Sequence, residues 1–269
     1  IKELNLENIR CLAMRGEEFA KLNSEEFDFV TARAVARLNI LNEIGYTVDF
    51  TIINSAESGV PQNRDRTYIC GVYLGDSEKY RADKRSVKVD ALKQELNKTE
   101  YKGFNFFNKV VFNNKQTYIQ DILETEVDSN YFLNSELVET FVKNTVIEET
   151  VEREDKIIKL FDLPRNIHND LERQRRVYSI KGISPTVLAR SDSTKIYVNV
   201  NGKNRIRKIT PAENFYIQGF SKKFVKNIID IGMSVTQMYK QSGNAVSPPV
   251  ISGILKTLYK EYIGNDKIY

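Results

Sequence analysis

Cysteine and histidine are scarce in this chain of 269 residues. The two cysteines, Cys11 and Cys70, are too few for a disulfide scaffold, and the single histidine, His168, comes without any Cys-x-x-Cys pair. The sequence therefore argues against a metal site and favours a reducing compartment. No apolar run approaches the roughly 20 residues of a membrane span, and no secretory signal follows Ile1. We therefore expect a cytoplasmic protein with no membrane partner.

Charge and hydropathy are ordinary for a soluble globular protein. Charged residues make up 28% of the chain and hydrophobic residues 41%. The net charge of +4 is too small to indicate nucleic acid by itself. Patterns of apolar residues predict a helix over residues 34–44, which Gly45 ends. They also predict one strand before this helix, over residues 27–32, and two strands after it, over residues 46–54 and 66–74. This order predicts an α/β sheet.

The later part of the chain predicts more helices and one hairpin. The helix candidates are residues 135–144, 148–161, 225–231 and 250–262. Asn201-Gly202 is a hairpin signal, and Thr210 with Glu213 has the pattern of a capping box. Pro248 and Pro249 suit the first turn of the last helix.

Three strings carry the most specific chemistry: residues 59–66 (GVPQNRDR), 210–220 (TPAENFYIQGF) and 241–250 (QSGNAVSPPV). In the first, alternation places Gln62, Arg64 and Arg66 on one side of the chain. A guanidinium suits a base carbonyl, a phosphate or a carboxylate, although an isolated Arg-x-Arg pair is more often a surface ion pair. In the third, small residues permit close backbone approach before a helix, although Gly-Asn alone is usually a turn.

In this order the strings resemble the late motifs of DNA cytosine-5 methyltransferases, over about residues 41–269. The resemblance implies a partial S-adenosylmethionine-dependent (Rossmann-like) α/β sheet plus a mixed target recognition domain. It also implies that Gln62, Arg64 and Arg66 line the pocket for the extruded cytosine, with Arg66 acting near the base. Three residues would close the pocket for S-adenosyl-L-methionine: Asn244, Ala245 and Val246.

The same resemblance implies a division into three parts. Residues 1–75 would form a partial methyltransferase domain, residues 76–238 the target recognition domain, and residues 239–269 a helix that returns to the first part. Basic residues of the recognition domain, otherwise a solvated face, become candidate phosphate contacts for double-stranded DNA. They are Arg173, Arg175, Arg176, Arg205 and Arg207.

Residues 1–40 resemble a different family, the guanine-7 methyltransferases of small-subunit ribosomal RNA. The similarity is carried by residues 4–10 (LNLENIR), 15–18 (RGEE) and 27–36 (FDFVTARAVA). It implies contacts to the methyl donor by Gly16, where the family usually has alanine, and by Glu17 and Arg33. The chain therefore resembles a junction of two families near residues 41–45, as a gene fusion or a truncated gene would produce.

The cytosine-5 nucleophile has no counterpart in the sequence. The reaction needs a thiolate that attacks the sixth carbon of the ring, and the family supplies it from a Pro-Cys pair. None of the six prolines precedes a cysteine, and no two of the 13 glycines are separated by one residue, so the Gly-x-Gly donor turn is absent too. We expect the C-terminal portion or a subunit of a restriction–modification methyltransferase that needs a second polypeptide.

Two alternatives remain open at this point. One is a catalytically dead DNA-binding fragment or fusion product. The other is a remnant of a ribosomal RNA guanine-7 methyltransferase, which the first 40 residues alone support.

Overall fold

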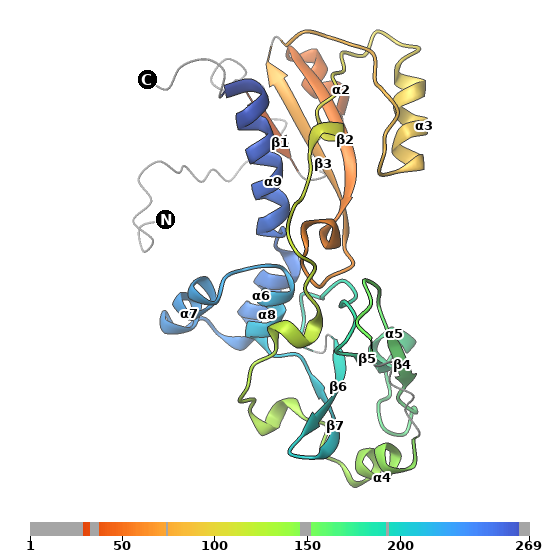
Figure 1. The fold of residues 1–269 in the computed structure, drawn as a ribbon, viewed down its shortest axis with the longest axis vertical. Coiled ribbons are helices and arrows are strands. Elements are labelled where there is room, and N and C mark those ends of the chain that lie inside the picture. The colour runs from red at the N-terminus through yellow and green to blue at the C-terminus, as the bar shows by residue number, and fades with distance from the viewer. Residues whose placement is uncertain (1–28, 33–37, 74, 146–151, 192–193, 264–269) are drawn as a thin grey trace. The chain divides into compact units, whose positions relative to one another are not determined.

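The computed structural model describes residues 29–32, 38–73, 75–145, 152–191 and 194–263 (Figure 1). The chain divides into two compact units, one of Ile1–Ile52 with Arg66–Lys109, and one of Ile53–Asp65 with Val110–Tyr269. Within the described ranges no helix has the length and apolar character needed to cross a membrane. The domain boundaries expected at residues 75 and 238 remain a prediction.

The first unit contains a three-stranded sheet in the order β1-β3-β2. Its strands are β1 (Phe29–Ala32), β2 (Tyr46–Asn54) and β3 (Asp65–Tyr73), and β1 runs antiparallel to β3. Helix α2 (Leu38–Glu43) precedes β2, and Gly45 follows it with a left-handed φ of 98°. The strands predicted at 46–54 and 66–74 and the glycine stop are thereby confirmed, because both signals act over a few residues.

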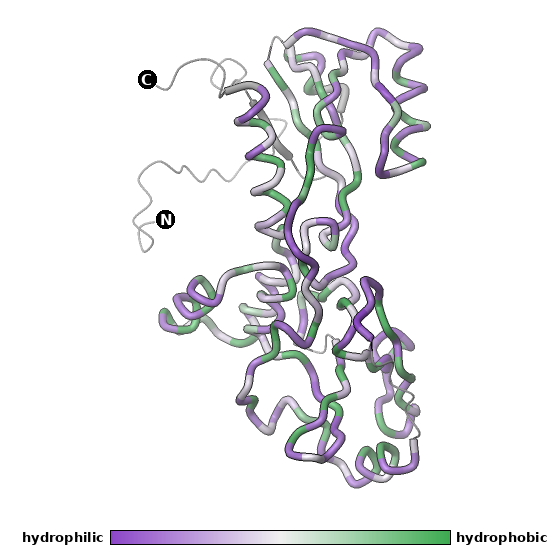
Figure 2. The backbone as a smooth tube through the Cα atoms, viewed as in Figure 1, coloured by the Kyte–Doolittle hydropathy of each residue, from purple (hydrophilic) through white to green (hydrophobic). Residues whose placement is uncertain are grey.

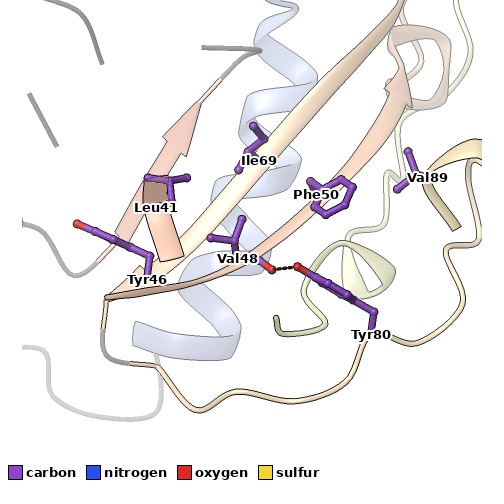
Figure 3. Packing of buried hydrophobic residues seen from close by; sticks show 7 residues of the cluster. All are labelled: Leu41, Tyr46, Val48, Phe50, Ile69, Tyr80 and Val89. Carbon is purple, nitrogen blue, oxygen red and sulfur yellow. Dashed lines mark hydrogen bonds between the residues drawn. The ribbon is translucent and has the colours of Figure 1, made fainter. Parts of the chain in front are cut away.

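The core of the first unit lies on β2 and its neighbours. Buried aliphatic and aromatic side chains pack together there (Figure 3): Leu41, Tyr46, Val48, Phe50, Ile69, Tyr80 and Val89. The Tyr80 hydroxyl donates to the Val48 carbonyl at 2.5 Å. Helix α3 (Val87–Leu96) alternates between hydrophilic and hydrophobic residues (Figure 2), and a 3-10 turn η3 (Phe107–Lys109) ends the unit.

The second unit contains a four-stranded sheet in the order β4-β5-β6-β7. Its strands are β4 (Lys159–Asp162), β5 (Arg176–Ser179), β6 (Lys195–Val200) and β7 (Lys203–Lys208). Strands β6 and β7 form the predicted hairpin, with Asn201 at φ 51° and Gly202 at φ 79° in its turn. The helix predicted over 148–161 is wrong in its described part, because residues 159–162 pair antiparallel with β5 and tertiary pairing overrides helix propensity.

Helices complete the second unit. They are α4 (Glu136–Asn144), α5 (Glu172–Arg175), α6 (Pro211–Ile217), α7 (Lys222–Asp230), α8 (Val235–Asn244) and α9 (Pro248–Leu258). Short 3-10 helices are η2 (Ser55–Ser58), η4 (Ile119–Ile122) and η5 (Ser129–Tyr131), and η6 (Tyr259–Ile263) is a short π-helix. The proline-led helix α9 confirms its prediction, whereas Gly243 and Asn244 end helix α8 instead of forming a free turn.

Candidate functional site

Gln62 is a fully buried link between three segments of the second unit. Its Nε2 donates to the side chain of Gln218 at 3.0 Å and to the carbonyl of Ile217 at 3.4 Å. Its Oε1 accepts from the backbone N–H of Val187 at 3.1 Å. The neighbouring backbone pairs with Ser184 in a parallel bridge. Since both ends of the amide are engaged, Gln62 joins the first string to the end of α6 and to residues 184–187.

Arg64 joins the first string to the third. It is only 2% exposed, and its Nη2 donates to the carbonyls of Gly243 at 3.0 Å and Ala245 at 3.2 Å. These carbonyls lie at the C-terminal end of α8, where the last carbonyls of a helix lack intrahelical partners and carry partial negative charge. A permanent cation therefore suits this buried position.

The end of α6 contacts the third string through buried amides and hydroxyls. Gln218 donates to the carbonyl of Ser242 at 2.8 Å and accepts from the hydroxyl of Ser247 at 3.2 Å. Asn214 donates to the hydroxyl of Ser242 at 2.7 Å. Sequence reasoning missed these residues as members of a network. The only sequence signal for this network was the presence of polar side chains in strings that also carry many apolar residues.

Gly243 meets the expectation of close backbone approach. A Cβ at this position would lie 2.4 Å from the backbone nitrogen of Ala189 and 2.5 Å from the carbonyl carbon of Leu188. Real Cβ atoms do not come so close, so only glycine fits without a backbone shift. The structure thus brings all three strings together in the second unit through Gln62, Arg64 and the α8 terminus.

Arg207 requires a correction. It was predicted to contact DNA phosphates, but it is 3% exposed and forms two bonds of 2.7 Å with the carboxylate of Glu213. Glu213 also completes the predicted capping box with Thr210 at the start of α6. A bidentate buried pair leaves this guanidinium no access to a phosphate. We therefore assign Arg207 to the fold.

The other predicted DNA contacts lie nearer the surface. Arg173 is exposed and donates to the carbonyl of Thr186 at 3.1 Å. Arg175 and Arg176 are half-buried, the former donating to the Leu163 carbonyl at 2.8 Å and the latter to Glu172 at 2.5 Å. Arg205, also half-buried, lies 4.5 Å over the ring of Phe132. Their phosphate contacts remain proposals.

For the remaining predicted site residues, the structure gives the element and the burial of each side chain. Arg66 is half-buried on β3 and belongs to the first unit. Asn244 is exposed, and Ala245 and Val246 are half-buried between α8 and α9. Three predicted methyl-donor contacts lie outside the described residues: Gly16, Glu17 and Arg33.

The 244–246 segment fits S-adenosyl-L-methionine only as one wall of a pocket. Its accessible surface is an amide and two small apolar side chains, which can cover a ligand but offer no charged group for its charged end. The glycine-rich turn that would oppose it is absent from the sequence. That this segment forms one wall of a donor site therefore remains a proposal.

Cys70 does not supply the missing thiolate. It lies in β3 with no exposed surface. Burial, and after it the negative charge of Asp49, raises the pKa of the Cys70 thiol to about 12. A nucleophilic cysteine needs a depressed pKa and access to substrate, so Cys70 is a packing residue.

Comparison with known proteins identifies a family. Residues 32–260 match the family model described as C-5 cytosine-specific DNA methylase. The orphan methyltransferase M.SPBetaI of Bacillus phage SPbeta is 26% identical over 84% of this chain and 61% of its own length. The type II methyltransferase M.SsoII of Shigella sonnei is 28% identical over 82% of this chain and 46% of its own. The chain thus spans about three fifths or less of these relatives.

A shorter match bears on the N-terminal prediction. Ribosomal RNA small subunit methyltransferase G of Thermotoga petrophila is 59% identical over 44 residues, which are 16% of this chain and 19% of that protein. A match over so small a part of the chain does not establish the family of the whole chain.

The fold is shown by solved structures. A DNMT2 methyltransferase of Spodoptera frugiperda superimposes with a TM-score of 0.53 at 14% identity, covering 87% of this chain and 67% of that one. The predicted methyltransferase α/β fold is confirmed by this likeness. With a family model that matches most of its length, the chain belongs to the C-5 cytosine-specific DNA methylase family.

Proposed function

We propose that this chain is the C-terminal, target-recognising portion or subunit of a DNA cytosine-5 methyltransferase, and that a second polypeptide supplies the catalytic cysteine. One observation carries the proposal. The family match covers residues 32–260, yet the sequence holds neither a Pro-Cys pair nor a Gly-x-Gly turn. Cys70 cannot replace the nucleophile, because its thiol is buried and its pKa is raised. The chain retains the late motifs and lacks the group that attacks cytosine.

The proposed roles follow from the surroundings of each residue. Gln62 and Arg64 hold the three strings together, and Arg66 faces the extruded cytosine, as the family resemblance implies. A flipped base is read by polar contacts inside its pocket, which a planar multi-donor guanidinium can provide. Phosphates of double-stranded DNA are assigned to Arg173, Arg175, Arg176 and Arg205.

S-adenosyl-L-methionine is the methyl donor that the family implies. We propose that Asn244, Ala245 and Val246 form one wall of its site. The donor supplies an electrophilic methyl group when bound, and the opposite wall comes from the second polypeptide. M.SsoII is named a type II methyltransferase and M.SPBetaI an orphan one, and we place this chain in a restriction–modification system of a prokaryotic cytoplasm.

The test is methyl transfer to DNA. The purified chain, labelled S-adenosyl-L-methionine and unmethylated duplex DNA are mixed with and without a polypeptide that carries Pro-Cys and Gly-x-Gly motifs. We expect label in DNA only when both polypeptides are present. Transfer by the chain alone that Cys70→Ser abolishes would show that the thiol was misplaced. DNA binding without transfer in any mixture would favour the catalytically dead fragment.

A second candidate rests on the 44-residue match to a ribosomal RNA methyltransferase. If residues 1–40 retain that family's chemistry, the chain should methylate small-subunit ribosomal RNA. The same assay with that RNA as substrate separates the two candidate functions. Label in RNA and none in DNA would favour the ribosomal RNA methyltransferase.

A further inference from the structure

Two cavities of the second unit adjoin each other, and they are lined in part by residues of all three strings but not by Gln62 or Arg64. One has a volume of about 420 Å³ and the other about 330 Å³. Both are lined by Asn114, Gly219 and Pro249, so they form one continuous depression. Close packing shapes its middle, since a Cβ on Gly219 would lie 2.7 Å from the Cδ of Pro249. We call the two cavities together the lysine groove.

The groove carries uncompensated positive charge. Lys256 lines the first cavity, and Lys115 and Lys222 line the second. All three are exposed, and across the described residues none forms an ion pair or a side-chain hydrogen bond. The acidic residue in the lining, Asp121, lies 3.3 Å from Arg153 and is thereby neutralised. An anionic ligand would therefore find three available cations.

The groove also has aromatic and apolar walls. Phe112 lines the first cavity beside its lysine, and Tyr216 and Phe220 line the second beside theirs. Val60 and Pro249 add flat apolar surface. Each cavity thus pairs aromatic or apolar wall with positive charge. A small anion needs convergent donors, whereas here each of the two cavities has its own cations and its own apolar wall.

We propose that the lysine groove binds a single strand of nucleic acid, with phosphates at the lysines and unpaired bases against the aromatic walls. Single-strand sites combine a positively charged groove with rings on which bases stack. A duplex buries the faces of its bases and could use only the charges. This site goes beyond the proposed function, which concerns duplex DNA and the arginines around β5 and β7.

The experiment follows binding of the full chain to a fluorescent oligothymidine of about 12 nucleotides over a range of salt concentrations. The test variant combines Lys115→Gln, Lys222→Gln and Lys256→Gln. The control variant replaces three exposed lysines outside the groove and so removes the same charge: Lys84→Gln, Lys88→Gln and Lys143→Gln. For single strands, the slope of log K against log salt should fall by about 0.7 per lost contact in the test variant only.

A second variant separates stacking from charge. Phe112→Leu keeps an apolar side chain and removes the ring, so affinity for oligothymidine should fall about tenfold with the slope unchanged. Circular dichroism establishes that each variant is folded.

Four results would overturn the inference: no binding of oligothymidine by the unmodified chain, equal loss in test and control variants, an equal loss of affinity for duplex DNA of the same length in Phe112→Leu, or displacement by polyglutamate as effective as by unlabelled oligothymidine. None of them touches methyl transfer to duplex DNA, so the proposed function stands or falls separately.

Discussion

Arg64 and Arg66 are two positions apart, yet their surroundings differ. Arg64 is 2% exposed, and its guanidinium contacts the carbonyls that end α8. Arg66 is half-buried on β3. A guanidinium engaged with backbone carbonyls holds the fold, whereas a partly accessible one can reach a ligand. We therefore separate an architectural arginine from one proposed to face the base.

Replacing Arg64 should destabilise the second unit. Arg64→Met removes two charge-assisted hydrogen bonds, and we expect the free energy of unfolding to fall by about 3 kcal/mol. Urea unfolding followed by circular dichroism measures this. Arg165→Met, at an exposed position of the same unit, should change stability by less than about 0.5 kcal/mol. Equal midpoints for the two variants would contradict the architectural role.

Arg66 should affect turnover and not DNA affinity. In the proposed complex with a second polypeptide, Arg66→Ala should lower the methyl-transfer rate by at least about 100-fold, as loss of a preorganised donor does. The salt dependence of duplex binding should stay nearly unchanged, whereas Arg173→Ala should reduce its slope by about one. If Arg66→Ala instead lowers the slope and spares turnover, Arg66 is a surface arginine.

At the scale of elements, the end of α8 depends on a glycine for steric reasons and the β6–β7 turn on one for conformational reasons. Gly243→Ala places a Cβ 2.4 Å from the Ala189 nitrogen and should cost about 3 kcal/mol of stability through overpacking. Gly202→Ala meets nothing within 4 Å but must keep φ near 79°, which should cost about 1 kcal/mol. Parallel urea titrations compare them. A milder effect at Gly243 would mean that residues 188–189 can move away.

Helix α3 is held to β2 by a buried charge cluster. Lys93 lies 2.7 Å from Asp49 and 3.0 Å from Asp83, with side chains 1% exposed. Burial alone would raise the pKa of Asp83. The hydrogen bond and charge of Lys93, with donors from Arg85 and Thr51, outweigh it, so the pKa is lowered from 3.8. Because the folded-state pKa lies below the unfolded one, the carboxylate stabilises the fold above about pH 4.

Acid should therefore weaken the first unit. We expect the free energy of unfolding to decline as the pH falls from about 4 through the lower folded-state pKa of Asp83. Asp83→Asn should be less stable at neutral pH and should lose part of this decline. Urea unfolding at several pH values for both proteins provides the comparison. Parallel pH profiles would exclude Asp83 as a contributor.

At the scale of the whole molecule, the match to M.SPBetaI covers 84% of this chain and only 61% of that relative. The proposed second polypeptide must bind the folded chain. Its presence should stabilise the chain by about 2.7 kcal/mol at 100 times its dissociation constant, with a melting temperature that rises with partner concentration. A polypeptide with the same motifs mutated at its Pro-Cys cysteine should stabilise equally and support no transfer. Absence of any shift would argue against a two-polypeptide enzyme.

Several features could be predicted from the sequence because their physics is local. Four of them each depend on a few neighbouring residues: the left-handed glycine after α2, the Asn201-Gly202 turn, the capping box of Thr210 and Glu213, and the proline-led start of α9. The order of the three strings is likewise a property of the sequence alone.

Tertiary structure alone decided what those residues touch. Arg64 and Gly243 are 179 positions apart, and no pattern in either string showed that one guanidinium would be engaged with the end of α8. The burial of Arg207 against Glu213 and the pairing of residues 159–162 with β5 also override local signals. The reason is that burial and partner choice are set by the packing of distant segments, whereas turns and caps are set by adjacent backbone.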